Sequence, residues 1–347
     1  MRTHPRTRWT APVLAVTAVL LASAAVPASA ATTTALGSPQ VVPIPDSQVR
    51  WYANDSTFPY LPNATGTANL TFWVDGVNYR STGQTLDTMS PVNPTTAVLS
   101  AGPKGSFDGN GAWLFQAVRD PEDPSGAIYG FYHAEDHIFA DGVTGYEYNS
   151  TGLAVSTDDG VTWTKEGQII GTPQPQTAQN GGHEINSVVY DPINKRWLGI
   201  GHGIAYASTD PGAAPGTWKG WDGSAFTVSM PSTSTDAGKT KPLSSLGSNI
   251  SDCDLTWNTY LGKFVLVYKN WGDNTHVYMK TSTDGITWGA ATTLLTAAAG
   301  KTVGYPQLIG TSSSVAGQQA TLVYEQWPST TGRNRDMVER TVQFTTG

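Results

Sequence analysis

Residues 186–202 read NSVVYDPINKRWLGIGH, and residues 253–269 read CDLTWNTYLGKFVLVYK. Both stretches run from an apolar segment through a polar turn to an aromatic residue, a second apolar segment and a polar end. They align without a gap at an offset of 67 residues. β-Branched and aromatic residues between Asp, Asn, Pro and Gly turns predict two antiparallel strands in each copy. The chain is therefore built from repeated β units.

Two looser copies flank this pair, one from Trp113 to His133 and one from Tyr305 to Glu325. A third strand follows several copies and ends in a recurrent turn, as in residues 153–163 (LAVSTDDGVTW) and 277–288 (VYMKTSTDGITW) and, with an insertion, in 204–218. No window of about 12 residues shows uninterrupted helical periodicity. Units of three or four strands that start about 55 to 75 residues apart are typical of propeller blades. The sequence therefore predicts an all-β chain folded as a β-propeller.

The repeats also predict the number of blades. Four units occupy residues 105–170, 183–230, 249–295 and 303–345, and residues 40–100 supply a less regular fifth. Five blades are expected, or six if the N-terminal region divides. An open propeller leaves sheet edges unpaired, so we expect the last strand, residues 338–344, to pair with an early part of the chain and close the ring.

Charge and cysteine content exclude several classes of protein. The chain has 20 Lys and Arg against 27 Asp and Glu, a net charge of −7, which argues against a nucleic-acid partner. Its single cysteine, Cys253, makes neither an internal disulfide nor a thiolate zinc site. The flanking carboxylates, Asp252 and Asp254, oppose the formation of a thiolate. We therefore expect Cys253 to be a small buried residue of a strand.

The first thirty residues have the pattern of a secretory signal peptide. A basic start is followed by an apolar run over residues 11–25 and by Ala28-Ser29-Ala30, the small-x-small form of a cleavage site. The run is short for a membrane span of about 20 residues. The sequence thus predicts a secreted, extracellular protein with one propeller domain over residues 31–347. We expect it to be a monomer that does not associate with membranes after cleavage.

The recurrent turns carry a resemblance to known families. Ser156, Asp158, Gly160, Thr162 and Trp163 have the spacing of the Asp-box turn of sialidases and other secreted propellers. The second copy keeps the same Asp, Gly, Thr and Trp at residues 284–288, in a form that resembles five-bladed glycoside hydrolases of the arabinanase, arabinofuranosidase and xylosidase group. Such turns are local, because a short side chain bonds backbone N–H groups and Gly supplies a positive φ. These aspartates are therefore expected to be structural, not catalytic.

Polar residues recur where the repeats should reach the central channel. The second strand of four units ends in a polar residue, namely His133, His202, Lys269 and Glu325. Acids and histidines mark the start of the first strand of three units, namely Asp108, His183, Glu184, Asp252 and Asp254. Buried groups of this kind are costly unless they are paired or used. We expect them to surround one opening, where side chains of all blades converge.

The densest cluster of polar residues lies at residues 133–137. Alternation along a strand places His133 and Glu135 on one face, with His137 next if the strand continues, and Asp136 belongs to the same cluster. This spacing suits a metal ion held by His133 and His137, or the hydroxyl groups of a sugar. Sugars also stack on aromatic rings, for which loop residues are candidates: Trp51, Tyr52, Trp271, Tyr305 and Trp327. The partner expected from these features is a polysaccharide or oligosaccharide.

The resemblance to five-bladed hydrolases implies roles for individual residues. By blade order it implies Asp46 or Asp55 as the base, Asp108 as an orienting residue and Glu184 as the acid of a carboxylate pair. His183 precedes Glu184, and a general acid there needs burial to dominate over any imidazolium. The resemblance implies no required cofactor, although some of these enzymes place calcium or another divalent ion on the axis.

Three other functions remain open from the residues alone. A polysaccharide lyase would use His133, His202 and Tyr305. A non-catalytic carbohydrate-binding propeller would repeat the same residues in each blade, whereas the matched positions here differ. A sialidase needs an arginine triad, and residues 31–347 hold few arginines: Arg50, Arg80, Arg119, Arg196, Arg333, Arg335 and Arg340. No Gly-x-Ser-x-Gly elbow or phosphate-binding Gly-rich loop is present. The favoured hypothesis is that the protein is a glycoside hydrolase.

Overall fold

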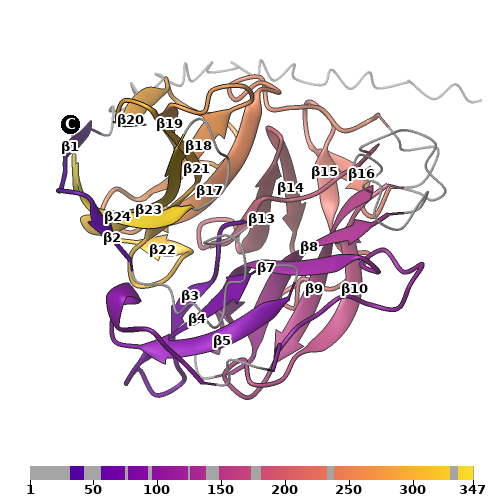
Figure 1. The fold of residues 1–347 in the computed structure, drawn as a ribbon. Helices are drawn as coiled ribbons and strands as arrows, with labels where there is room; N and C mark the ends of the chain where they lie inside the picture. Colours follow the sequence, from indigo (N-terminus) through magenta and orange to yellow (C-terminus); the bar gives the residue numbers. More distant parts are fainter. Residues whose placement is uncertain are drawn as a thin grey trace, which may run out of the picture.

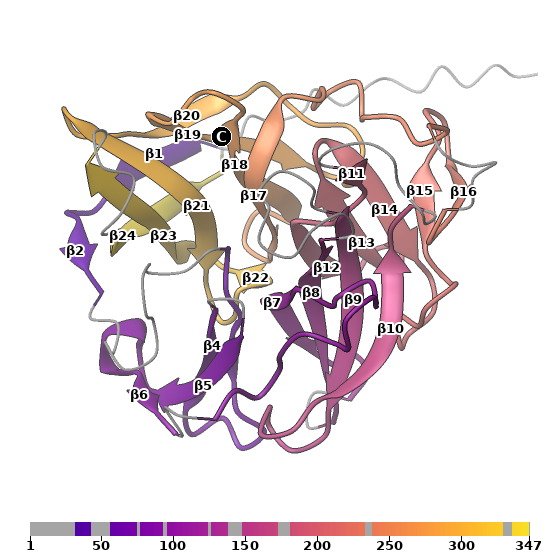
Figure 2. The same cartoon turned by 45° about the vertical axis from the view of Figure 1, so that its right-hand side comes forward.

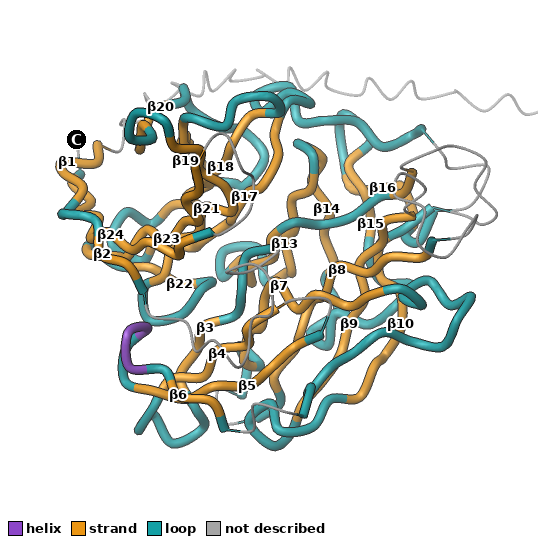
Figure 3. Tube along the Cα trace, in the orientation of Figure 1, coloured by secondary structure: helices purple, strands orange, loops and turns teal. Residues whose placement is uncertain are grey.

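The chain forms a ring of β-sheets around a central axis in a computed structural model (Figures 1 and 2). The structure describes residues 32–42, 56–74, 77–92, 96–123, 126–137, 148–172, 181–232, 238–328 and 335–346. These residues contain five sheets and, besides strands and turns, only the short 3-10 helix η1 (Leu86–Thr88), as Figure 3 shows. The predicted all-β, five-bladed propeller is confirmed, and the described residues hold no sixth blade.

Each sheet is one blade, and its strands follow each other outward from the axis. Blade 1 contains β3 (Tyr60–Pro62), β4 (Asn69–Val74), β5 (Asn78–Gly83) and β6 (Ser90–Pro91). Blade 2 contains β7 (Gly111–Arg119), β8 (Ile128–Asp136), β9 (Tyr148–Ser156) and β10 (Thr164–Ile170), with β11 (Gly181–Gly182) parallel to β9. Blade 3 contains β12 (Ser187–Asp191), β13 (Arg196–Gly201), β14 (Ile204–Ser208), β15 (Lys219–Trp221) and β16 (Phe226–Ser229).

Blade 4 contains β17 (Ile250–Asn258), β18 (Lys263–Asn270), β19 (His276–Ser282) and β20 (Thr292–Thr296), with β22 (Val315–Ala316) parallel to β17. Blade 5 contains β21 (Lys301–Ile309), β23 (Gln319–Pro328), β24 (Asp336–Thr345), β1 (Thr32–Leu36) and β2 (Gln40–Val41). The first strands of neighbouring blades contact each other, from β3 and β7 through β12 to β17 and β21. These five strands are the inner strands that surround the axis.

The ring is closed by the two ends of the described chain. Strand β1 pairs antiparallel with β24, so that Thr32 lies opposite Thr345 and Leu36 opposite Val342. This confirms the expectation that residues 338–344 pair with an early segment, because pairing removes the exposed edge that β24 would otherwise present.

The hydrophobic core lies between the blades. Five clusters of buried apolar side chains each join two neighbouring blades, including the pair formed by blades 1 and 5. Trp197 and Trp218 fill the cluster between blades 2 and 3, and Phe72 packs between blades 1 and 2. Each blade is apolar on both faces for this reason. No helix in the described part of the chain is long and apolar enough to cross a bilayer.

The recurrent turns lie at the outer ends of the third strands. Asp158 accepts hydrogen bonds from the Thr162 backbone N–H (2.9 Å) and hydroxyl (2.6 Å), and Asp284 accepts from the backbone N–H groups of Ile286 and Thr287. Gly160 and Gly285 have φ values of 75° and 74°, which a side chain would strain. These two aspartates stabilise the turns, and neither lines the axial cavity described below.

Candidate functional site

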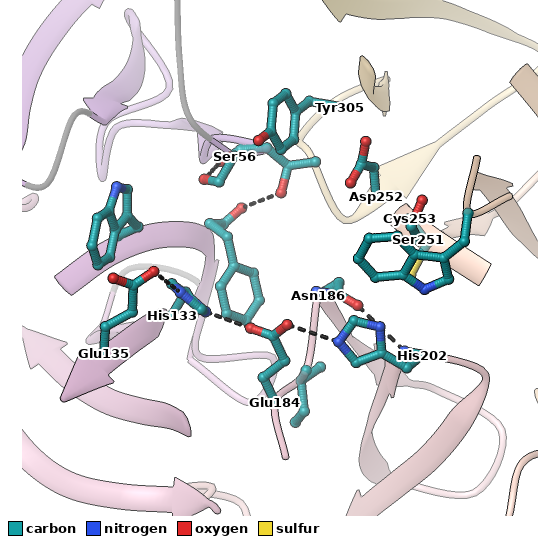
Figure 4. Close-up of a pocket in the computed structure, with 15 residues that line it drawn as sticks. Ser56, His133, Glu135, Glu184, Asn186, His202, Ser251, Asp252, Cys253 and Tyr305 are labelled. Atoms are coloured by element: carbon teal, nitrogen blue, oxygen red, sulfur yellow. Dashed lines mark hydrogen bonds and ion pairs between the residues drawn. The ribbon is translucent and has the colours of Figure 1, made fainter. Parts of the chain in front are cut away.

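A cavity of about 220 Å³ lies on the axis where the inner strands begin (Figure 4). Every blade contributes to it. Its lining residues are Ser56, Thr57, Trp113, Phe115, His133, Glu135, Glu184, Ile185, Asn186, His202, Ser251, Asp252, Cys253, Trp271 and Tyr305. The axial cavity therefore combines carboxylates, imidazoles, hydroxyls and aromatic rings contributed by different blades.

Three inner strands carry a β-bulge at the axial cavity. The pairing register shifts between Leu114 and Gln116 in β7, between Ser251 and Cys253 in β17, and between Gly304 and Gln307 in β21. The residues inside these shifts include Phe115, Asp252 and Tyr305, which all line the cavity. A bulge bends its strand and turns a side chain away from the regular alternation. The bulges thus direct these three side chains to the axis.

Backbone strain is concentrated at the same place. His202, Asp252 and Tyr305 have φ values of 50°, 33° and 46°, in the left-handed region that non-glycine residues seldom adopt. They are half of the non-glycine residues with positive φ in the described segments. Strained backbone persists where the surrounding structure enforces it, and it clusters at functional sites.

Glu184 is the central side chain of the cavity. It is 7% exposed and lies just before β12, where the Ile185 backbone N–H donates to Thr151 Oγ1 of blade 2 at 2.8 Å. Strand β13 passes very close, because a Cβ at Gly201 would lie 1.9 Å from the Glu184 carbonyl oxygen. Gly201 therefore allows His202, the next residue, to reach the carboxylate from the same blade.

Two histidines bracket the Glu184 carboxylate (Figure 4). His202 Nε2 lies 2.8 Å from Glu184 Oε1, and His133 Nδ1 of blade 2 bonds Glu184 Oε2. His133 Nε2 in turn lies 3.0 Å from Glu135 Oε1, and His137 Nε2 lies 2.9 Å from Glu135 Oε2. The result is an alternating chain of three imidazoles and two carboxylates, His202–Glu184–His133–Glu135–His137, which we call the imidazole–carboxylate chain.

Electrostatics fix the charges within this chain. Burial by itself would raise the pKa of Glu184, but His133 and His202 outweigh it and hold that pKa below its ordinary value. Burial would lower the pKa of His133, yet Glu184 and Glu135 raise it to about 10. Both nitrogens of His133 bond carboxylate oxygens, which requires both to be protonated. At neutral pH Glu184 is therefore an ionised carboxylate beside an imidazolium.

Asp252 and Tyr305 enter the axial cavity from blades 4 and 5. Asp252 Oδ2 forms an ion pair of 2.9 Å with Lys269 Nζ, and Lys269 also donates to Asn274 Oδ1 at 3.2 Å. The Arg335 guanidinium lies over the Tyr305 ring at 5.3 Å and bonds Glu325 Oε2 at 3.0 Å. Lys269 and Glu325 therefore do not line the cavity, but each is connected to it through one partner.

Other predicted site residues lie away from the axial cavity. Asp108 precedes β7 and bonds Lys165 of the outer strand β10, together with Ser106 Oγ (2.7 Å) and Tyr132 Oη (3.3 Å). His183 lies 3.4 Å from Tyr206 Oη, measured from its Nδ1 atom. Neither residue is part of the cavity lining, so the structure does not bring them together with Glu184 as expected.

Asp136 and Asp254 lie outside the lining of the axial cavity. Asp136 lies on the face of β8 opposite His133 and Glu135, is 6% exposed, and is not a lining residue. Asp254 is buried between blades, where it accepts hydrogen bonds from Ser187 Oγ (3.1 Å) and the Leu308 backbone N–H (2.9 Å). Burial raises the pKa of Asp254 to about 7 in spite of these bonds. Asp254 therefore connects blades 3, 4 and 5 through hydrogen bonds.

The metal-binding interpretation of His133 and His137 finds no suitable set of ligands. The described residues contain no group of three or more His, Cys, Asp or Glu side chains placed to hold an ion. Glu135 bonds both histidines, and His133 also bonds Glu184. In the structure, the described side chains of His133 and His137 are thus joined through Glu135 in a hydrogen-bonded chain.

Some predictions fall outside the described residues, and some lining residues were missed. The candidate bases Asp46 and Asp55, the aromatic residues Trp51 and Tyr52, and the predicted signal peptide all lie outside. Trp113, Phe115 and Asn186 also line the cavity, although the sequence pattern did not predict them as site residues. Trp113 faces His133 across the β7–β8 pair, so the register of the repeat could have located it. Cys253 is buried in β17 as expected, and burial raises its pKa.

A second hollow of about 710 Å³ lies where the inner strands end, at the opposite mouth of the ring. Its residues include Leu61, Val118, Tyr190, Trp257 and Val315. Buried polar residues separate the two mouths, since Gln116 bonds Ser313 and Gln307 bonds the Phe58 backbone. Among the described residues, the lining of the opposite mouth includes no histidine, so the axial cavity is the better candidate for chemistry.

Comparisons with known proteins agree with the fold. No family model matches the chain, and no curated protein matches it. Among solved structures, a GH43 β-1,3-galactosidase with galactodeoxynojirimycin is similar over 88% of this chain and 95% of its own, at 10% identity and a TM-score of 0.54. A mutant α-L-arabinanase of Cellvibrio cellulosa is similar over 84% and 90%, at 13% identity and a TM-score of 0.52.

A mutant exo-β-1,3-galactanase of Phanerochaete chrysosporium with β-1,3-galactotriose is similar over 87% of this chain, at 11% identity and a TM-score of 0.50. This chain spans 64% of that galactanase. At such low identity the likeness shows a shared fold. The chain is thus similar in fold to these glycoside hydrolases.

Proposed function

We propose that the chain is a glycoside hydrolase that binds and cleaves a saccharide in the axial cavity. The observation that carries this proposal is Glu184, a buried carboxylate kept ionised by His133 and His202 at the point where all five blades meet. The fold shared with glycoside hydrolases supports it. The asymmetry of the cavity supports it too, because each blade supplies a different side chain.

Glycoside hydrolysis needs a carboxylate that acts on the sugar carbon or on water, and a group that protonates the leaving oxygen. The resemblance implied that Glu184 is the proton donor. The two histidines favour the ionised form instead, so we assign Glu184 the first role, as base or as the group that stabilises positive charge on the sugar. Asp252 lines the same cavity from blade 4, where Lys269 holds it in an ion pair of 2.9 Å, and it is our candidate for the second carboxylate of the site.

The substrate class follows from the lining of the cavity. Carboxylates, imidazoles and the amide of Asn186 bond hydroxyl groups, while Trp113, Trp271 and Tyr305 offer aromatic surface. A volume of about 220 Å³ is below the roughly 300–1,000 Å³ of sites for drug-sized ligands, which suits one sugar unit at a time. None of the described arginines lines the cavity, which disfavours a sialidase. With the predicted signal peptide, the proposed site of action is extracellular.

A polysaccharide lyase is the second candidate, because His133, His202 and Tyr305 all line the cavity. A lyase abstracts a proton with a base. His133 is a poor base at neutral pH, since the neighbouring carboxylates raise its pKa to about 10. This observation favours hydrolysis over elimination.

A screen of the purified protein on polysaccharides and oligosaccharides tests the proposal. Reducing ends and ultraviolet absorbance are read from the same reaction. New reducing ends without an absorbing, unsaturated product support hydrolysis. An unsaturated product supports the lyase, and saccharide binding without turnover supports a carbohydrate-binding propeller.

A further inference from the structure

Trp271 has an unusual environment for a large apolar side chain. It follows β18 at the edge of the axial cavity and is 59% exposed. It is the only exposed tryptophan among the residues that the structure describes. The other described tryptophans are buried or half-buried, as expected when a large aromatic side chain serves packing. Core packing therefore does not explain Trp271.

The ring of Trp271 lies against the imidazole–carboxylate chain. It stacks on His202 with 5.8 Å between ring centroids and an interplanar angle of 19°. His202 Nε2 is bonded to Glu184 at 2.8 Å, as Figure 4 shows. The His202 imidazole thus lies between the Trp271 indole and the Glu184 carboxylate, and more than half of the surface of Trp271 is exposed to solvent.

Trp113 provides a contrast on the other side of Glu184. It covers His133 at 5.3 Å but is tilted by 59°, and it is half-buried within blade 2. Each histidine beside Glu184 is therefore next to an indole, but only the indole of blade 4 is exposed. If covering an imidazole were the whole purpose, a buried ring would serve both positions, because leaving apolar surface in water forgoes about 25 cal/mol per Å².

We propose that Trp271 is a saccharide-stacking residue at the mouth of the axial cavity, where its exposed indole binds the C–H face of a sugar unit adjacent to the one at Glu184. This proposal rests on the proposed function for the identity of the ligand. The electron-rich face of an indole attracts the weakly positive C–H groups of a sugar ring, and the contact removes apolar surface from water. Trp271 then determines affinity for saccharides longer than one unit.

Fluorescence and kinetics with a panel of galacto-, arabino- and xylo-oligosaccharides test this proposal. Saccharide titration should change the tryptophan emission of the wild type, and Trp271→Phe should remove most of that change. Trp271→Ala should raise KM for the cleaved oligosaccharide about tenfold with kcat within about twofold, because aromatic anchors dominate binding contacts. Trp271→Phe should restore most of the affinity.

Tyr260→Ala is the matched control. Tyr260 is 39% exposed and lies outside the axial cavity, so its removal should leave KM and the emission change unaltered. Unchanged affinity in Trp271→Ala, or equal losses in Tyr260→Ala, overturns the stacking role even if the wild type cleaves the substrate. Trp271-dependent binding without cleavage keeps the stacking role and overturns the hydrolase. A wild type that binds none of the panel overturns both.

Discussion

Blades 3 and 4 share a scaffold but carry different chemistry. Their first two strands match at the offset seen in the sequence, since Ser187 pairs with Ile200 in blade 3 and Asp254 with Val267 in blade 4. In blade 3 the second strand leads to His202, which bonds Glu184 at 2.8 Å. In blade 4 the matched residue is Lys269, which bonds Asp252 at 2.9 Å. Each of these two blades thus places one carboxylate beside one basic side chain at the axis.

The two blades differ in the side chain that pairs with the carboxylate, which is His202 for Glu184 and Lys269 for Asp252. Lysine and histidine differ as partners of a carboxylate, because the histidine imidazole is the side chain that ordinarily titrates close to neutrality. The neighbouring carboxylate raises the pKa of His202 despite its burial, so Glu184 controls the charge of its partner. The blade 3 pair is therefore suited to proton chemistry and the blade 4 pair to holding Asp252 in place. The predictions below test this division.

Removing the Glu184 charge should have the largest effect. Glu184→Gln keeps the shape and the hydrogen-bonding capacity of the side chain, and we expect kcat to fall by about 10³-fold on any substrate that the wild type cleaves. Steady-state kinetics measures the loss, and circular dichroism checks that the fold persists. Glu166→Gln, an exposed glutamate of β10, serves as the matched control and should retain wild-type rates. Wild-type activity in Glu184→Gln excludes this residue from catalysis.

His133→Gln should shift the pH dependence of activity as well as its size. Loss of the imidazolium removes the main interaction that lowers the pKa of Glu184, so burial then raises that pKa. The acidic limb of the kcat/KM profile should move upward by at least about one pH unit, with about a 100-fold loss at its maximum. A profile that falls in height without moving would mean that His133 does not set the charge of Glu184.

The blade 3 and blade 4 pairs should separate activity from stability. His202→Gln should lower kcat/KM about tenfold with little change in the free energy of unfolding. Lys269→Met leaves Asp252 without its cation in a mostly buried position, and it should destabilise the fold by about 2 kcal/mol. Urea unfolding and kinetics on both variants measure the two quantities. Equal effects on stability would show that the two pairs have the same role.

Stability should depend on pH through His133. Its pKa is raised from 6.5 to about 10, so the stabilisation is complete below pH 6.5 and is lost as the pH rises toward 10. Glu184 has a lowered pKa, so on the acid side the same pairing is lost as the pH falls below the ordinary value of 4.5. Thermal unfolding at constant ionic strength should show Tm declining above pH 6.5, and His133→Gln should flatten that decline. A parallel decline in this variant contradicts the assignment.

The smallest effect is expected in the recurrent turn of blade 2, which holds Asp158. Asp158→Ala removes the acceptor of three hydrogen bonds in an exposed turn, one from Ser156 Oγ and two from Thr162, and should lower Tm by about 2–4 °C. The kcat/KM value should stay at the wild-type level, because this turn lies away from the axial cavity. A loss of activity without a loss of stability would show that the turn has a functional role after all.

The sequence repeat predicted the fold well because its pattern of apolar and turn residues is determined by local structure. Strand-turn-strand units, their period and the closure by the last strand all follow from alternation, turn residues and the need to cover sheet edges. The same register placed His133, His202 and Glu184 near the axis, and the structure brings these three together. Each of them lies at a regular position of its strand or at a strand end.

The failures in predicting the site arise where the register is broken. Asp252 and Asp254 are two residues apart, so regular alternation places both on one face. The bulge at Asp252 turns it to the axis, while Asp254 bonds the neighbouring blades. Asp108 lies in a loop that folds back toward Lys165 of β10, a contact set by tertiary structure. A single extra residue in a strand leaves no clear signature in the pattern of apolar residues.

The most direct test is the crystal structure of the Glu184→Gln variant with an oligosaccharide that the wild type cleaves. We predict a sugar unit in the axial cavity, in contact with the side chain at position 184 and with Asp252, and with its neighbouring unit on Trp271. A saccharide bound only at the opposite mouth, beside Trp257 and Tyr190, with none at the axial cavity, would contradict the proposed site.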